Sequence, residues 1–282
     1  MSINSGTLYI VATPIGNLED FSPRAVRILK EVDLIAAEDT RHSQKLLNHF
    51  GINTKMRSYH DFSRANTGKE LIKRLMSGED LALISDAGTP LISDPGYKLV
   101  KTVHKQGIKV VPVPGPSSLI SALSVAGLPT DRFIFEGFAP EKQAARRKRL
   151  ESLREEERTL VFFESPHRIM AFLEDAVAVF GPERPVTLAR EITKIHETIH
   201  HASLETLYEE FQDQQQPEKG EFVAVIAGTG TAMSVPERET DRVLALLLDA
   251  LPVKQAAALA ARITGGRKNE IYQRALELQG KH

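Results

Sequence analysis

Three loops rich in glycine, proline and serine each follow a short apolar run in the first half of the chain. The runs and their loops are Leu8–Val11 with Ala12–Asn17, Leu81–Ile84 with Ser85–Pro90, and Val110–Val111 with Pro112–Ser118. A short apolar run that ends in such a loop and precedes a helical pattern is typical of a strand, a loop and a helix. Ligands of open α/β sheets bind outside the carboxyl ends of the strands. We therefore expect the three loops to converge on one small-molecule site.

Strand and helix patterns alternate through residues 1–115, which predicts an α/β domain with a mostly parallel sheet. The expected strands are Leu8–Val11, Leu34–Ala37, Leu81–Ile84 and Val110–Val113, and the expected helices are Pro23–Lys30, Ser43–His49, Thr67–Met76 and Gly96–Lys105. Asp94 is expected to cap the last of these helices. The segment from Pro112 to Leu119 is interpreted as the hinge into a second unit.

Residues 116–232 have a denser strand pattern, which predicts a second α/β domain with a mixed sheet. Its expected strands are Phe133–Gly137, Thr159–Phe163, Val186–Ala189, Glu197–His200 and Phe222–Ala227, and its expected helices are Glu141–Glu156, Pro166–Val179 and Leu204–Phe211.

After a linker that extends to Pro236, the remaining residues read as helix only. The patterns Asp241–Ala250, Val253–Ile263 and Lys268–Leu278 are separated by Leu251-Pro252 and Gly265-Gly266. This spacing predicts a small bundle or a helix-turn-helix unit over residues 236–282.

Composition narrows the class of protein. The chain has 282 residues and no cysteine, which excludes disulfides and thiolate zinc sites and fits a reducing compartment. No apolar run approaches the ~18 residues needed to span a bilayer, and the N-terminus lacks the pattern of a signal peptide. We expect a cytoplasmic protein without a membrane partner. The formal net charge of −1 says little about other partners.

Six motifs together resemble the class III methyltransferases, also called the tetrapyrrole methylase family. They are LYIVATPIGNLED at 8–20, AAEDTRHSQKLL at 36–47, SDAGTPLISDPG at 85–96, VPGPSS at 113–118, FFESPHR at 162–168 and LAREITKIHE at 188–197. The first loop reads ATPIGN where tetrapyrrole methylases usually have a glycine-rich GxGxGD-like loop. The chain therefore resembles the RNA-modifying branch of the family more than the porphyrin branch.

The resemblance implies two α/β domains of the tetrapyrrole methylase type with the cofactor cleft between them, plus the small C-terminal helical unit. It implies S-adenosylmethionine as the methyl donor and a homodimer. For the RNA-modifying branch, it implies 2′-O-methylation of a cytidine ribose in the decoding centre of 16S rRNA within the small ribosomal subunit.

The resemblance also carries the cofactor contacts over to individual positions. The first two loops supply Ile15, Gly88, Thr89 and Ile92, the third supplies Ser117 and Ser118, and the second domain supplies Phe163, Glu164, Val223 and Ala224. Between Phe163 and Glu164, either residue could make the contact.

Glu38, Asp39, Thr40, Arg41 and His42 follow a predicted strand and so lie at the same sheet edge as the cofactor loops. A base near the ribose hydroxyl would assist methyl transfer. We expect Asp39 and His42 near that hydroxyl and Arg41 on a phosphate. The alternative is that the two carboxylates cap the next helix and pair with Arg41.

Two further groups of residues are predicted to contact RNA. Four consecutive basic residues lie within a predicted helix, and basic side chains suit phosphate contacts that do not depend on sequence. The alternatives are a helix face that aids solubility and, for Arg190 and Lys194, a solvated ion-paired edge. The predicted RNA-binding residues are His60, Arg64, Arg146, Arg147, Arg149, Arg190 and Lys194.

Other functions remain open at this stage. A tetrapyrrole C-methyltransferase of the precorrin type would share the fold, and so would a non-catalytic RNA-binding protein. His196 and His200 are four residues apart, but they fall in a predicted strand without a third ligand, so no metal site is expected. The chain has neither a P-loop nor a GxGxxG motif, which leaves ATP and NAD without support.

Overall fold

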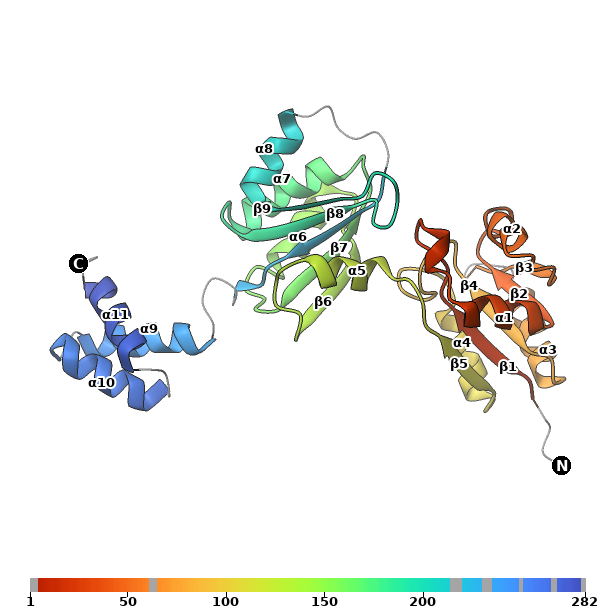
Figure 1. Ribbon diagram of the computed structural model, residues 1–282, viewed down its shortest axis with the longest axis horizontal. Coiled ribbons are helices and arrows are strands. Elements are labelled where there is room, and N and C mark those ends of the chain that lie inside the picture. The colour runs from red at the N-terminus through yellow and green to blue at the C-terminus, as the bar shows by residue number, and fades with distance from the viewer. Residues whose placement is uncertain are drawn as a thin grey trace.

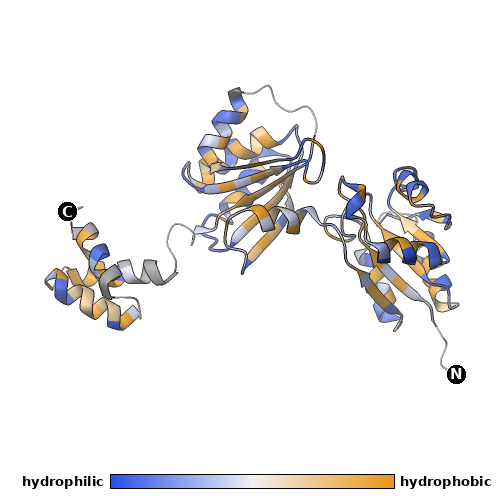
Figure 2. Cartoon of the chain, in the orientation of Figure 1, coloured by the Kyte–Doolittle hydropathy of each residue, from blue (hydrophilic) through white to orange (hydrophobic). Residues whose placement is uncertain are grey.

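The computed structural model describes residues 5–60, 65–213, 220–229, 235–248, 251–264 and 268–279. They form two five-stranded sheets with flanking helices, followed by three helices that stand apart from both sheets (Figure 1). Apolar residues dominate the central strands of both sheets (Figure 2). Within the described ranges no helix combines the length and the apolar character that crossing a membrane requires.

The first sheet is entirely parallel and has the strand order β3-β2-β4-β1-β5. Its strands are β1 (Thr7–Val11), β2 (Leu34–Ala37), β3 (Met56–Ser58), β4 (Leu81–Ile84) and β5 (Lys109–Val113). Its helices are η1 (Leu18–Asp20), α1 (Pro23–Glu31), α2 (Thr40–His49), α3 (Ala65–Met76) and α4 (Tyr97–Lys105). All residues of β2 and β4 are buried, as expected for strands covered on both faces.

The local sequence explains where the helices of this sheet begin. Ser22 caps α1 by accepting a hydrogen bond from the backbone N–H of Ala25, and Pro23 occupies the first helical position. The expected cap at Asp94 is wrong, because α4 begins after Gly96, whose φ of 135° favours glycine and which makes no side-chain cap. Asp94 is therefore available for another role.

The second sheet has the order β6-β7-β10-β8-β9, with β6 and β7 parallel and the other neighbours antiparallel. Its strands are β6 (Phe133–Phe138), β7 (Thr159–Glu164), β8 (Pro185–Arg190), β9 (Thr198–Ser203) and β10 (Phe222–Ile226). Its helices are α5 (Ser118–Val125), α6 (Gln143–Glu151), α7 (Ile169–Phe180) and α8 (Leu204–Asp213). The expected α/β class, the parallel first sheet and the mixed second sheet are confirmed.

Each face of the second sheet has its own apolar core. The side chains of α6, α7 and α8 pack with Phe162, Phe222 and Ala224 on one face. Helix α5 packs with Val161 and Val223 on the other. Successive residues of a strand point to opposite faces, which is why Val223 and Ala224 belong to different cores.

The three C-terminal helices are α9 (Val235–Leu248), α10 (Val253–Thr264) and α11 (Lys268–Gln279). They enclose an apolar cluster of their own, formed by Val243, Leu244, Ala257, Ala260, Ile271 and Ala275. Helix α9 begins six residues before the expected Asp241, since a proline such as Pro236 is tolerated in the first turn of a helix.

Some expected boundaries differ from the structure. Helix α6 covers only Gln143–Glu151, and β9 covers Thr198–Ser203. Strand β3 was not expected, because three residues are too few to show a periodic pattern. The end of the expected hinge is instead the first turn of α5, for which Ser117 is the N-cap.

Candidate functional site

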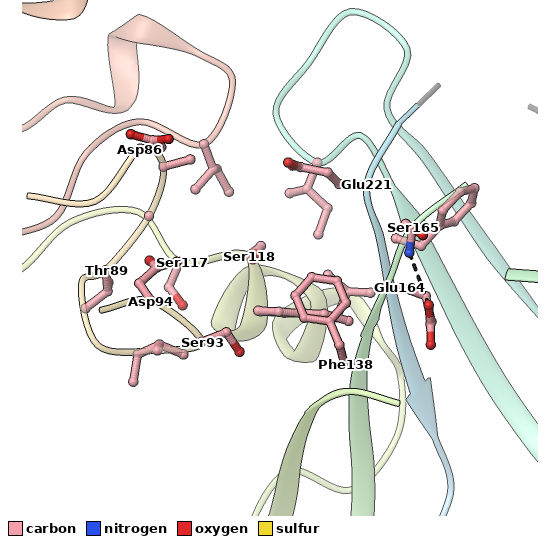
Figure 3. A pocket seen from close by; sticks show the side chains of 18 of the residues that line it. Asp86, Thr89, Ser93, Asp94, Ser117, Ser118, Phe138, Glu164, Ser165 and Glu221 are labelled. Atoms are coloured by element: carbon pink, nitrogen blue, oxygen red, sulfur yellow. Dashed lines mark hydrogen bonds between the residues drawn. The ribbon is translucent and has the colours of Figure 1, made fainter. Parts of the chain in front are cut away.

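A cavity of about 420 Å³ lies where the loops after β1, β4 and β5 face the second sheet. Asp86, Thr89 and Asp94 stand on one side of it, and Phe138, Glu164 and Glu221 stand on the other (Figure 3). Ser117 and Ser118 lie between these walls at the start of α5. The expectation that the three loops would converge is confirmed.

Backbone hydrogen bonds hold the three loops against one another. Thr13 and Gly88 exchange two bonds: the Thr13 N–H donates to the Gly88 carbonyl at 2.9 Å, and the Gly88 N–H donates back at 3.1 Å. The Thr89 hydroxyl donates to the Pro116 carbonyl at 3.1 Å, which ties the second loop to the third. The cavity wall is therefore prearranged by the chain itself.

Gly88 has a backbone conformation that explains its residue type. Its φ is 81°, in the left-handed region that favours glycine. A Cβ at this position would lie 3.4 Å from Cγ2 of Ile15, another residue of the cavity wall. A larger side chain would thus combine backbone strain with loss of cavity space.

Nine of the ten predicted cofactor residues line this cavity. They are Ile15, Gly88, Thr89, Ile92, Ser117, Ser118, Phe163, Glu164 and Val223. Ala224 does not line it, because its side chain points to the opposite face of β10 and packs in the core beneath α6, α7 and α8. For Ala224 the expectation is corrected. Phe163 and Glu164 are both in the wall.

Three carboxylates gather on the first-sheet side of the cavity: Glu38, Asp86 and Asp94. Burial, followed by repulsion from Asp86, raises the pKa of Glu38. Burial raises the pKa of Asp94 to about 6; a hydrogen bond with Ser85 opposes this rise, and repulsion from Glu38 and Asp86 adds to it. The cavity is thus acidic at neutral pH and favours a ligand with positive charge.

The second-sheet side contributes aromatic and ion-paired groups. Phe163 packs edge-on against Phe138 with ring centroids 5.7 Å apart. Glu164 is buried, accepts a hydrogen bond from the Ser165 N–H at 3.2 Å and pairs with Arg168 at 3.3 Å. Because Arg168 balances its charge, Glu164 adds less to the acidity of the cavity than Asp86 or Asp94.

Two loops beside the cavity contain non-glycine residues with positive φ. Leu91 (74°) and Ser93 (67°) lie in the loop after β4, and Glu191 (52°) and Thr193 (67°) lie between β8 and β9. Such backbone conformations cost about 1–3 kcal/mol each and cluster at functional sites.

A second cavity, of about 300 Å³, lies on the other side of the first loop. Its wall consists of Pro14, Gly16, Leu18, His42, Ser43, Lys45, Leu46, His49, Ser85 and Asp86. Asp86 belongs to both cavities, so the two sites adjoin at its side chain. Among the residues that the structure describes, no group of three or more His, Asp or Glu could hold a metal ion.

A profile of the tetrapyrrole (corrin/porphyrin) methylases matches residues 7–208. The chain belongs to this family. A second profile, described as the RsmI C-terminal HTH domain, matches residues 234–279 of the methylase, which include α9, α10 and α11.

Curated relatives match the methylase over nearly its whole length. The ribosomal RNA small subunit methyltransferase I of Pseudomonas aeruginosa is 54% identical and covers 99% of this chain and 100% of its own. The protein of the same name from Escherichia coli O157:H7 is 51% identical, with coverages of 98% and 97%.

Solved structures show the same fold at low identity. The uroporphyrin-III C-methyltransferase of Thermus thermophilus, solved with S-adenyl homocysteine, has a TM-score of 0.53 and 20% identity. That match covers 79% of the methylase and 98% of the solved chain.

The three predicted catalytic residues, Asp39, Arg41 and His42, do not lie together at one site in the structure. Asp39 caps α2: its carboxylate accepts the Arg41 N–H at 2.8 Å and pairs with the Arg41 guanidinium at 3.3 Å. These bonds hold the pKa of Asp39 below its usual value, which makes it a weak base. Neither Asp39 nor Arg41 lines either of these two cavities, whereas His42 lines the second one.

The predicted RNA contact at Arg146 is wrong. Its side chain is only 5% exposed, and its Nε donates to Oδ2 of the buried Asp175 at 2.7 Å. Its guanidinium also donates to the Glu141 carbonyl at 3.0 Å. The four basic residues encircle α6, so this one faces the core and cannot reach a phosphate.

The other predicted RNA-binding side chains have intramolecular partners. Arg147 is half exposed and pairs with Asp175 at 2.5 Å, and Arg149 pairs with Glu136 at 2.6 Å. Lys194 pairs with Glu191 at 2.8 Å and with Glu221 at 3.2 Å, and it also packs against Gly16.

Two further predicted RNA-binding residues, Arg190 and His60, line neither of the two cavities. Arg190 stacks over the Phe222 ring at 5.9 Å, and the exposed His60 lies within hydrogen-bonding distance of the Ser58 hydroxyl at 3.2 Å. Arg64 falls outside the described residues.

Sequence reasoning missed Asp86 and Asp94 as site residues. Both belong to the motif SDAGTPLISDPG, and Asp86 is the second residue after the end of β4. Glu38 and Asp39 are candidate site residues because they follow the carboxyl end of a strand, and the same criterion applies to Asp86.

We expect Asp94→Asn to stabilise the unliganded methylase by about 1 kcal/mol at pH 7.5, a figure reduced for partial exposure. The folded-state pKa of Asp94 is about 6, above the ordinary value of 3.8. The native state therefore holds this proton more tightly, and the contribution of Asp94 to wild-type stability falls as pH rises through 4 to 6. The variant lacks that fall. Urea unfolding of both proteins from pH 4 to 8 measures the difference, and a constant difference would contradict the prediction.

Proposed function

We propose that the chain is an S-adenosylmethionine-dependent methyltransferase that modifies the 2′-oxygen of a cytidine ribose in the decoding centre of 16S rRNA. The main support is the near full-length similarity to proteins named ribosomal RNA small subunit methyltransferase I. The matched C-terminal helix-turn-helix profile supports a nucleic-acid substrate over a free tetrapyrrole. The rival functions are a precorrin-type C-methyltransferase and a non-catalytic RNA-binding protein.

The larger cavity fits the proposed donor. S-adenosylmethionine has a sulfonium and an ammonium against one carboxylate, and so it has a net positive charge. Glu38, Asp86 and Asp94 supply the complementary negative charge. The N-terminus of α5, with Ser117 and Ser118, suits the donor's carboxylate, because helix N-termini attract anions. When bound, the donor would supply an electrophilic methyl group.

Residues of this chain would then contribute positioning rather than covalent chemistry. Bringing a nucleophile and an electrophile together in the correct orientation contributes several kcal/mol to catalysis. The loops after β1, β4 and β5 would hold the donor, and the hydrogen bonds among them reduce the reorganisation needed on binding. We place the cofactor contacts at the nine lining residues and extend them to Asp86 and Asp94.

Substrate contacts are proposed outside the donor cavity. Arg147 and Arg149 on α6, together with Arg190, Lys194 and His60, would contact the phosphate backbone.

We propose that the three units act as separate domains, over residues 1–115, 116–232 and 236–282, the last recognising the substrate. A homodimer in the cytoplasm completes the proposal, and exposed apolar side chains on α5, such as Ile120 and Val125, offer a surface for association. Light scattering would measure the oligomeric state.

The decisive experiment compares acceptors. Protein and methyl-labelled S-adenosylmethionine are incubated with assembled small subunits, naked 16S rRNA or a porphyrinogen, and the products are digested and analysed by mass spectrometry. Label in a 2′-O-methylcytidine supports the proposal. Label on the porphyrinogen alone would establish the C-methyltransferase. Donor binding without transfer to any acceptor would contradict the proposed reaction, and absence of donor binding would favour the non-catalytic protein.

A further inference from the structure

We propose that the second cavity is the acceptor-nucleotide subsite of this enzyme: a ribonucleotide of single-stranded RNA enters between the first loop and α2. This inference rests on the proposed function. It concerns a surface distinct from the residues assigned to the donor, except that Asp86 lies in the wall of both cavities. Four observations carry it: the pattern of α2, an unpartnered buried hydroxyl, the charge of the wall and the shared carboxylate.

One face of α2 forms much of the cavity wall. His42, Lys45, Leu46 and His49 have the spacing i, i+3, i+4 and i+7, which places them along a single face of a helix. Three of these four side chains can donate hydrogen bonds and can be cationic. The face is therefore suited to an anion such as a phosphodiester.

Ser43 contributes a buried and unpartnered hydroxyl to the wall of the cavity. The residue is 2% exposed and lines the cavity, and its hydroxyl has no hydrogen-bond partner within the described residues. A buried hydroxyl without a partner costs about 1–3 kcal/mol. Its oxygen is covered in the unliganded protein, so a small movement of the wall on binding would let a ligand polar group satisfy it. This observation is independent of the basic side chains.

The cationic groups of the wall are not neutralised by ion pairs. Within the described parts of the chain, no salt bridge is present for Lys45 or His49, whereas Arg147, Arg149 and Lys194 all have carboxylate partners. Pro14, Leu18 and Leu46 add apolar surface on which a sugar or base can pack. A wall that combines an unpaired lysine, two imidazole rings and apolar surface fits a nucleotide better than an inorganic anion.

The shared wall places this subsite next to the methyl donor. Ile15 lines the donor cavity, while its neighbours Pro14 and Gly16 line the second one. Asp86 stands at the junction, and its Oδ1 accepts the Asp39 N–H at 3.0 Å, which fixes the carboxylate. A nucleotide in the second cavity would have its ribose nearest to Asp86, which can accept a hydrogen bond from the 2′-hydroxyl and so orient it.

Two variants of exposed residues test the proposal. Lys45→Ala and His49→Ala should each raise KM for the ribosomal substrate by about tenfold or more, as expected for loss of a charge-assisted hydrogen bond. Affinity for S-adenosylmethionine, measured by calorimetry, should stay within about twofold. Lys30→Ala on α1 is the matched control, because Lys30 is exposed and lines neither cavity. Lys45→Arg should retain most of the affinity.

A second measurement is independent of turnover. Cytidine 3′,5′-bisphosphate, which keeps a free 2′-hydroxyl and carries a phosphate on each side of the nucleotide, is titrated into the full-length protein with S-adenosylhomocysteine present. The NMR signals of the His42 and His49 rings should shift saturably, and Lys45→Ala should weaken that binding.

The outcomes separate this inference from the proposed function. If the wild type transfers methyl groups to RNA but the variants match Lys30→Ala in KM and the ring signals do not shift, the subsite is wrong and the function stands. A parallel loss of donor affinity in the variants would place the cavity in the donor site and overturn the inference. If the wild type methylates no RNA while the ring signals shift with the bisphosphate, the nucleotide site stands and the proposed reaction fails.

Discussion

Replacing Arg146 by alanine is expected to lower the free energy of unfolding by about 3 kcal/mol, since removal of one partner of a buried ion pair leaves the other charge uncompensated. Asp175 is completely buried and accepts from Arg146 at 2.7 Å. Arg147 and Gln143 remain as its partners in the variant, at 2.5 and 3.3 Å, and they limit the loss. Urea unfolding followed by circular dichroism gives the value.

The neighbouring residue supplies the control for this experiment. Lys148 is exposed on the same helix, and Lys148→Ala should change the unfolding free energy by less than about 0.5 kcal/mol. Equal stability of the two variants would mean that the Arg146–Asp175 pair contributes nothing to the fold. It would also reopen Arg146 as a phosphate contact.

Deletion of residues 235–282 is expected to reduce kcat/KM for the ribosomal substrate by at least about a hundredfold, which corresponds to about 2.8 kcal/mol of lost recognition. Folding and donor affinity should persist, because α9, α10 and α11 have their own apolar cluster and the two sheets have separate cores. Neither cavity includes a residue of this unit.

Thermal melts, calorimetry with the donor and methylation assays on the truncated protein measure these three properties. Arg262→Ala in the full-length chain is the companion variant, because Arg262 is exposed on α10 and its loss leaves the helices in place. A truncated protein that unfolds or loses donor affinity would show that the helical unit supports the fold or the dimer instead of the substrate.

The cavity that we assign to the donor could be predicted from sequence because its determinants are local. Each of the three loops follows its own apolar strand, and the geometry of a parallel sheet brings strand ends together regardless of which residues fill the core. The expectation at Val223 came from the family resemblance, and Val223 lines the cavity, whereas its neighbour Ala224 does not. The choice between them depends on which face of β10 meets the cavity. The packing of the second sheet decides which of the alternating side chains of β10 lie on that face.

The misassigned residues depend on contacts between distant segments. The run from Arg146 to Arg149 looks like a surface feature until α7 places Asp175 beneath it. The sequence pattern favours Asp94 as a helix cap, but Gly96, with its positive φ, occupies the N-cap position of α4. The face formed by His42, Lys45, Leu46 and His49 was visible as a helical spacing, yet its significance depends on the first loop packing opposite it.

The acidic wall of the donor cavity has a consequence for turnover. Under the proposed function, methyl transfer removes the sulfonium charge and leaves a neutral thioether. The ligand then has one positive charge fewer to interact with the carboxylates of Glu38, Asp86 and Asp94, while the rest of the ligand keeps its shape. The wall thereby binds the charged donor more tightly than its neutral product. The carboxylates that lower the stability of the unliganded protein thus also favour replacement of the product by new donor after every cycle.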